Sequence, residues 1–219
     1  VSRDWSSDVC SSDLTSSNYE EKGKIVGGKN GYGAKLTNIF SKEFVVETVD
    51  SGTKKIFKQT YSDNMSKRTE PDIKDTKSSS YTMISFIPDY ARFGMTGLDA
   101  DIEGLLIRRV YDLTATTDKT VSIFLNDERI DCKDFEKYVD MYIGNKDTNK
   151  RVYECADPRW EYAVALAPSQ EFTQISFVNG ICTYKGGKHI EYVIGQIVRK
   201  LITFIEKKKK VRVNASVIK

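Results

Sequence analysis

The sequence is best understood from residues 27–41, which run Gly27-Gly28-Lys29-Asn30-Gly31-Tyr32-Gly33-Ala34-Lys35-Leu36-Thr37-Asn38-Ile39-Phe40-Ser41. The glycines let the backbone turn tightly and approach a ligand. Leu36, Ile39 and Phe40 are spaced three and four apart, which predicts a helix with one apolar face. Backbone N–H groups at a helix N-terminus favour an anion, and Lys29 and Lys35 add positive charge. The stretch therefore predicts a phosphate-binding loop that runs into a helix.

Two common glycine-rich nucleotide-binding motifs do not fit this loop. A Walker A loop that starts at Gly28 has its second glycine at Gly33, but Ala34 stands where lysine is required and Leu36 where the hydroxyl residue should follow Lys35. A dinucleotide-binding Gly-x-Gly-x-x-Gly that starts at Gly31 ends on Leu36, and the residues before the loop are polar rather than strand-like. Both nucleotide motifs are excluded by spacing.

The spacing of Gly28, Gly31 and Gly33 gives Gly-x-x-Gly-x-Gly, which resembles the ATP lid of the GHKL ATPases, the family of gyrase, Hsp90, MutL and histidine kinases. The full string resembles the eukaryotic-type DNA topoisomerase II family in particular. The resemblance implies that the loop wraps the triphosphate of ATP. The ATP-binding residues it implies here are Gly28, Lys29, Asn30, Gly31, Tyr32, Gly33, Ala34 and Lys35. Without it, the same glycines would be explained by a turn that caps an ordinary helix.

Composition indicates the broad class of protein. The chain has 219 residues, of which 39% are hydrophobic and 30% charged, so it can bury a core as one large or two small domains. Its net charge of +3 is too small to indicate nucleic-acid binding by itself. Cys10, Cys132, Cys155 and Cys182 are far apart, which indicates neither a zinc site nor a disulfide framework. No apolar run is long enough to predict a membrane helix, so no membrane partner is expected.

The N-terminal residues divide into two parts. Residues 1–14 contain Ser-Ser-Asp twice and no amphipathic period, and we interpret them as a non-native artefact rather than a polar extension. Residues 15–19, Thr-Ser-Ser-Asn-Tyr, predict a turn. In the resembled family a Thr-Ser-Ser-Asn segment before the lid contacts the nucleotide, which adds Ser16, Ser17 and Asn18 to the implied ATP-binding residues.

Several strands and helices are predicted downstream of the loop. Residues 44–49 and 54–61 predict a β-hairpin, and 62–80 a mobile surface loop. A strand with both faces at least half buried is predicted for 81–87. The remaining predictions of this half are a helix at 98–114 with apolar residues on one stripe, a strand at 120–125, a turn at 126–127 and a helix at 135–143.

Polar residues 144–150 are predicted as the domain boundary, so that 15–147 form one domain and 148–219 the start of another. Strands are predicted at 151–155, 160–167 and 172–178, and a long helix at 188–205. Between the last two lie Phe177-Val178-Asn179, Thr183 and Gly186-Gly187-Lys188-His189, which resemble the transducer signature of type II topoisomerases and gyrase. We expect His189 to make a structural hydrogen bond rather than act in catalysis. The run 207–210, four lysines, could attract DNA phosphates or could simply be a solvated helix end.

The resemblance extends from Thr15 to Lys219 and implies an α/β (α+β) fold: the C-terminal part of a GHKL (Bergerat) sandwich, then the start of a ribosomal-protein-like transducer domain. It implies a parent topoisomerase that uses ATP and Mg2+, forms a homodimer and passes one double-stranded DNA through another. No Glu in the chain is followed four residues later by Asn, the pair that supplies the general base and the magnesium ligand in GHKL enzymes. The magnesium ligand is therefore expected upstream, and this chain alone is predicted to be inactive. The implied location is nuclear in a cell, or cytoplasmic or virion-associated for a viral source.

Two alternatives remain open at this point. Another GHKL ATPase would share the lid but lack the second motif, and a non-catalytic nucleotide-binding or interaction module would use the lid as a simple turn. If the chain folds by itself, Phe40, Phe44 and Ile84 are expected to be exposed, which predicts aggregation.

Overall fold

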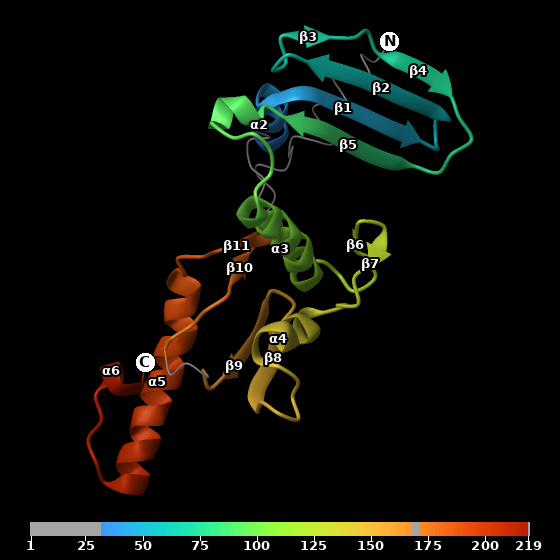
Figure 1. The fold of residues 1–219 in the computed structure, drawn as a ribbon. Helices are drawn as coiled ribbons and strands as arrows, with labels where there is room; N and C mark the ends of the chain where they lie inside the picture. The colour runs from blue at the N-terminus through green and yellow to red at the C-terminus, as the bar shows by residue number, and fades with distance from the viewer. Residues whose placement is uncertain (1–31, 168–170, 219) are drawn as a thin grey trace. The chain divides into compact units, whose positions relative to one another are not determined.

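The computed structural model describes residues 32–167 and 171–218, and these residues divide into two compact units between Glu103 and Gly104. Figure 1 labels the elements of each unit. The division falls inside a helix, whereas the domain boundary expected from composition lies at residues 144–150. That domain boundary remains a prediction.

The first unit is a short helix followed by an antiparallel sheet. Its elements are α2 (Tyr32–Ile39), β1 (Ser41–Asp50), β2 (Lys55–Ser62), β3 (Lys67–Arg68), β4 (Asp72–Asp75), β5 (Tyr81–Pro88) and a 3-10 turn, η1 (Tyr90–Phe93). The sheet runs β3-β2-β1-β5, and β4 also pairs with β2. The register sets Asp50 opposite Lys55, so the predicted hairpin is confirmed.

Several predictions for this unit are wrong. Residues 62–80 were expected to form a loop but contain β3 and β4, because their backbones complete the ladder along β2. The helix begins at Tyr32, so residues 32–35 are its first turn rather than loop. Its buried residue is Asn38, while Leu36 is exposed. The spacing of apolar residues along α2 did not show which face of the helix the sheet would cover.

The core of the first unit lies on one face of the sheet. Phe44 and Val46 of β1 and Phe57 of β2 are almost completely buried. Burial of each such side chain contributes roughly 1.5–3 kcal/mol. Gln59 is also buried, and it is satisfied because its amide donates to Thr69 O at 2.9 Å while its oxygen accepts from Tyr61 Oη. Phe44 was expected to be exposed, and that expectation is wrong.

The second unit contains most of α3 (Ala100–Thr116), then β6 (Phe124–Leu125), β7 (Glu128–Arg129), α4 (Phe135–Ile143), β8 (Arg151–Asp157), β9 (Trp160–Ala165), β10 (Phe177–Val178), β11 (Ile181–Cys182), α5 (Lys188–Lys209) and α6 (Ala215–Ile218). The strands form three separate hairpins, β6-β7, β8-β9 and β10-β11. The bounds predicted for α4 are confirmed, as are the turn at 126–127 and the β8 and β9 strands.

Other predictions for the second unit need correction. The strand expected at 172–178 is reduced to 177–178, and that at 120–125 to 124–125, since only these residues find antiparallel partners. On α3 the predicted apolar stripe is partly solvent-exposed: Leu105 is 57% exposed, whereas Asp112 and Thr114 are buried. On α5, Val198 is buried while Leu201 and Phe204 are exposed. The buried side of each helix was set by its neighbours.

The core of the second unit gathers around Tyr138 of α4, with Ile130 and Cys132. Side chains of α3 and Phe177 of β10 pack against this group. The rings of Tyr138 and Phe177 meet edge to face at 5.8 Å, a geometry that aromatic pairs prefer. The same tyrosine is also the centre of a polar network, described below.

Candidate nucleotide-binding site and its supports

Four of the predicted ATP-binding residues, Tyr32, Gly33, Ala34 and Lys35, form the first turn of α2. A helix leaves its first N–H groups without intrahelical partners. This turn contains no acidic residue that would compete with an anion. The other predicted residues lie outside the described ranges: Ser16, Ser17, Asn18, Gly28, Lys29, Asn30 and Gly31.

The first turn of α2 is open to solvent. Tyr32 is 62% exposed, and a Cβ placed on Gly33 would meet no atom within 4 Å. Lys35 is exposed as well. Thr37 Oγ1 donates to Gly33 O at 2.9 Å, so this hydrogen bond uses a carbonyl of the turn and none of its N–H groups. Exposed N–H groups at a helix N-terminus are able to bind an anion.

The C-terminal end of α2 is fixed by the turn after β2. Asn64 Nδ2 donates to Ile39 O at 3.0 Å and to the Asp89 carboxylate at 3.1 Å. The backbone N–H of Asp89 in turn donates to Phe40 O at 2.8 Å. Lys42 completes the group by an ion pair with Asp89 at 3.2 Å. These contacts hold the helix against the sheet, and sequence analysis missed them.

The sequence pair Asp63-Asn64 could have indicated the turn after β2. Asp and Asn tolerate the left-handed backbone conformation, which both residues adopt here with φ of 52° and 59°. Burial by itself would raise the pKa of the Asp89 carboxyl. Hydrogen bonds from Asn64 and Lys42 outweigh that effect and lower its pKa below the usual value.

The second motif forms a hydrogen-bonded cluster around Thr183. Thr183 Oγ1 donates to Ser176 O at 3.0 Å and lies 3.2 Å from His189 Nε2. Its carbonyl accepts the Gly186 N–H at 2.9 Å and the Gln174 amide at 3.2 Å. The spaced Thr and the His of the motif therefore stabilise the same turn, and the prediction that His189 makes a structural hydrogen bond is confirmed.

The turn between β10 and β11 was not predicted. Asn179 and Gly180 both have positive φ, 51° and 76°, between the paired residues Val178 and Ile181. A two-residue Asn-Gly turn matches the right-handed twist of a hairpin. The Asn-Gly pair was the sequence signal for this hairpin, whereas the prediction ended the strand at Val178 and included no partner strand at 181–182.

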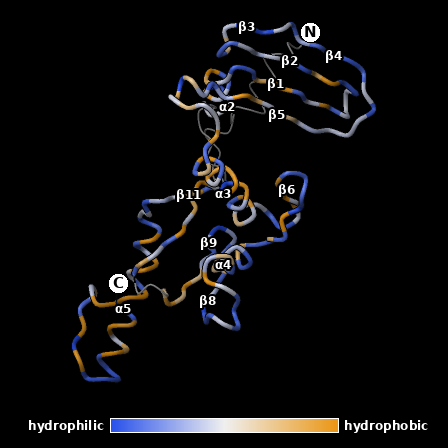
Figure 2. Tube along the Cα trace, in the orientation of Figure 1, coloured by the Kyte–Doolittle hydropathy of each residue, from blue (hydrophilic) through white to orange (hydrophobic). Residues whose placement is uncertain are grey.

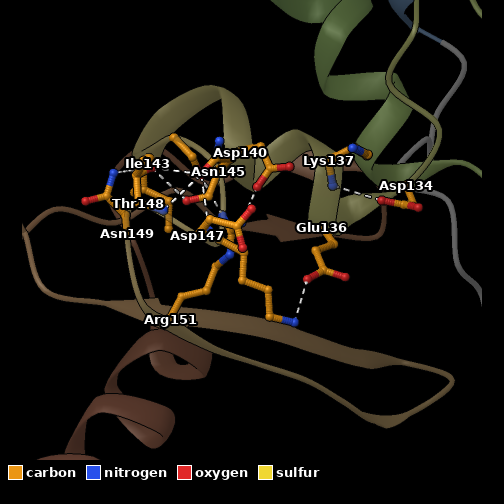
Figure 3. A network of polar contacts seen from close by, with 12 residues as sticks. Asp134, Glu136, Lys137, Asp140, Ile143, Asn145, Asp147, Thr148, Asn149 and Arg151 are labelled. Carbon is orange, nitrogen blue, oxygen red and sulfur yellow. Dashed lines mark hydrogen bonds and ion pairs between the residues drawn. The ribbon is translucent and has the colours of Figure 1, made fainter.

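Residues 144–150, the predicted boundary segment, are tied down by polar contacts (Figure 3). Asn145 Oδ1 accepts the backbone N–H groups of Asp147 and Thr148 at 3.1 and 2.9 Å. Arg151, whose side chain is 1% exposed, donates to Gly144 O at 3.1 Å and pairs with Asp140. The segment is polar in composition, but these bonds give it a defined conformation.

A second polar network lies in the core of the same unit. Tyr138 Oη donates to Asp112 Oδ1 at 2.6 Å and lies 3.0 Å from Tyr142 Oη. Asp112 is completely buried, and its Oδ2 has no hydrogen-bond partner in the described part of the chain. Burial and the bond to Asp112 raise the pKa of Tyr138 far above its usual value, so the phenol stays protonated. The network joins α3 to α4.

The four lysines end α5: Lys207 to Lys209 lie in its last turn, and Lys210 is the C-cap, with φ of 56°. Cations there stabilise the helix dipole. Across residues 32–167 and 171–218, no cluster of acidic, histidine and cysteine side chains is arranged to hold a metal ion. None of the helices in these ranges has the length and apolar character needed to cross a bilayer.

The structure resembles solved ATPase regions. The ATPase region of Saccharomyces cerevisiae topoisomerase II matches with a TM-score of 0.81 and 41% identity, over 92% of this chain and 52% of that one. The ATPase and transducer domains of Balamuthia mandrillaris DNA topoisomerase II match with a TM-score of 0.79 and 41% identity, over 89% and 50%. The chain therefore has the mixed α/β architecture of a GHKL-type ATPase and transducer region.

Sequence comparison identifies the family within this class of ATPase and transducer regions. A family model described as DNA gyrase B matches residues 134–219. DNA topoisomerase 2-alpha of Rattus norvegicus is 47% identical over 203 residues, 90% of this chain. DNA topoisomerase 2 of Drosophila melanogaster is 47% identical over 208 residues, 92% of this chain. The chain belongs to the type II DNA topoisomerase family, and it spans 13% and 14% of the length of these two relatives.

Proposed function

We propose that this chain is the lid-side and transducer portion of an ATP-dependent DNA topoisomerase. The observation that carries the proposal is the identity of 47% to topoisomerases over nine-tenths of the chain. In the proposed parent enzyme, ATP binding closes a homodimeric gate and one DNA duplex passes through a break in another. Residues 15–147 would belong to the ATPase domain and 148–219 to the transducer. A nuclear location follows for a cellular source.

The proposed role of α2 is electrostatic. Its first-turn N–H groups and Lys35 would stabilise the charge of the nucleotide phosphates, with Ser16, Ser17, Asn18 and residues 28–31 completing the contacts. Support comes from the open space beside Gly33 and the absence of acidic residues in the first turn of α2. Mg2+ would help to neutralise the charge of the phosphates when bound, and its protein ligand is proposed to lie outside this sequence.

The test is a titration of the chain with a fluorescent, non-hydrolysable ATP analogue and Mg2+. Lys35→Ala should weaken binding about tenfold, since one charged hydrogen-bonding group is lost. Lys133→Ala is the matched control, because Lys133 is an exposed lysine of the second unit. Equal affinities of the two variants would contradict the role of Lys35. ATP turnover by the chain that Lys35→Ala abolishes would contradict its predicted inactivity.

A further inference from the structure

The turn that follows β2, residues 63–66, has an unusual backbone. Asp63, Asn64 and Met65 all have positive φ, of 52°, 59° and 67°. Single Asn and Asp residues adopt this left-handed conformation readily, but three successive non-glycine residues in it store strain that the surroundings must hold. Such strain is concentrated at functional sites, so the turn is a candidate for a function beyond joining two strands. The largely hydrophilic chain after β2 can be followed in Figure 2.

Hydrogen bonds to the start of β1 hold the turn in this conformation. The Asp63 N–H donates to Lys42 O at 3.0 Å. The Asn64 N–H donates to Ser41 O at 3.0 Å, and Ser66 Oγ donates to Asp63 O at 2.7 Å. The backbone of the turn is therefore attached to the part of β1 that comes directly after α2 in the chain.

The Asn64 side chain extends from this turn to the C-terminal end of α2. One N–H of its amide donates to Ile39 O at 3.0 Å, and the other donates to the Asp89 carboxylate at 3.1 Å. Ile39 is the last residue of α2, so its carbonyl has no partner within the helix. The Asp89 carboxylate and the C-terminal carbonyls of a helix carry negative charge, and the donor amide between them makes their approach favourable. A single side chain thus joins the turn, the helix and the residue that precedes η1.

Further contacts at the same end restrain the direction of α2. Ser41 Oγ donates to Thr37 O at 2.5 Å, and the Asp89 N–H donates to Phe40 O at 2.8 Å. The Phe40 ring packs against Phe93 of η1 with centroids 5.4 Å apart. With eight residues, α2 is a rod about 12 Å long, so a tilt of about 10° about this end moves its first turn by roughly 2 Å. Groups that bind a ligand need to be held within about 0.5 Å, so the C-terminal contacts affect the N-terminal turn.

We propose that Asn64 is a positioning residue for nucleotide binding: it fixes the C-terminal end of α2 and thereby directs the first-turn N–H groups and Lys35 toward the phosphates. This inference rests on the proposed function of α2. Asn64 contacts the opposite end of α2 from the first turn, so it acts through the helix and not by contact with the nucleotide. The strained turn serves this role, because it directs the amide toward both Ile39 O and Asp89.

The test compares Asn64→Gly with Met65→Gly in the full chain. Glycine adopts a positive φ without strain, so both variants keep the backbone of the turn and only Asn64→Gly removes the amide. Met65 is the matched control, because it is the next residue of the same turn and has a similar φ. Asn64→Gly should raise the dissociation constant for the fluorescent, non-hydrolysable ATP analogue with Mg2+ about fivefold or more, and Met65→Gly should change it less than about twofold.

Hydrogen exchange without nucleotide is the second measurement. The α2 amides should exchange faster in Asn64→Gly than in the wild-type chain and in Met65→Gly, because the helix loses a restraint at its end. Protection of the β1 amides should be the same in all three chains, which shows that the sheet is intact.

The two measurements separate this inference from the proposed function. Equal affinities of Asn64→Gly and Met65→Gly for the analogue overturn the inference alone. Faster α2 exchange with equal affinities overturns it as well and leaves Asn64 a structural residue. A wild-type chain that does not bind the analogue overturns the proposed function, and this inference with it.

Discussion

Replacing Tyr138 by Phe should strongly destabilise the second unit. The substitution keeps the ring and its packing but removes the hydroxyl that donates to Asp112 Oδ1 at 2.6 Å. Asp112 is completely buried, and its other oxygen already has no hydrogen-bond partner in the described ranges. Leaving a buried carboxylate without a donor costs about 3 kcal/mol. Tyr142→Phe should cost less, about 1 kcal/mol, because Tyr142 is exposed and only the 3.0 Å contact is lost.

The assay is urea unfolding followed by tryptophan fluorescence. The chain has two tryptophans, so a Trp5→Phe background leaves Trp160 of β9 to report on the second unit. With a urea dependence of about 2 kcal/mol/M, a loss of ~3 kcal/mol lowers the midpoint by roughly 1.5 M. Tyr142→Phe should lower it by about 0.5 M. If Tyr138→Phe shifts the midpoint no more than Tyr142→Phe, the hydrogen bond to Asp112 does not stabilise the unit as argued.

Two further predictions concern acid stability and the β10-β11 turn. The pKa of Asp89 is lowered in the folded chain, so its contribution to stability is present above the unfolded pKa of about 4 and is lost as pH falls through the lower folded value. Asp89→Asn should therefore flatten the dependence of the unfolding midpoint on pH below about 4, measured by circular dichroism, and an unchanged slope would show that another carboxyl is responsible. Gly180→Ala should destabilise the second unit by about 1 kcal/mol, because φ is +76° there. Gly195→Ala is its control, since Gly195 lies within α5 and a Cβ added there would meet no atom within 4 Å, and a larger loss at Gly195 would contradict the turn geometry.

The local elements were largely predictable from the sequence. The β1-β2 hairpin follows from two β-branched and aromatic runs joined by Asp50-Ser51-Gly52-Thr53, and the structure confirms it. The bounds of α4 follow from its apolar spacing and from Asp134, which caps the helix by accepting the Lys137 N–H. Such features depend on neighbours within a few residues, so a periodic pattern is sufficient to indicate them.

Burial was harder to predict, because it depends on which surface another element covers. Apolar periodicity predicted two buried faces for β5, but its side chains are exposed, since β5 is the edge strand among the described residues. Helix α3 shows the same effect, since Leu105 is exposed and Asp112 is buried. A hydrophobic stripe shows which side of an element can be buried, and not whether anything covers it.

The sequence by itself indicated the family, because two glycine-containing motifs in a fixed order, within residues 27–41 and 177–189, resemble those of type II topoisomerases. It also indicated that His189 is structural. Only the tertiary structure decided that Thr183 is the partner of His189, that Tyr138 satisfies the buried Asp112, and that Asn64 and Asp89 fix the end of α2. These contacts join residues that turns and packing bring together. The hydrophobic periodicity along the chain does not indicate which of these side chains will be in contact.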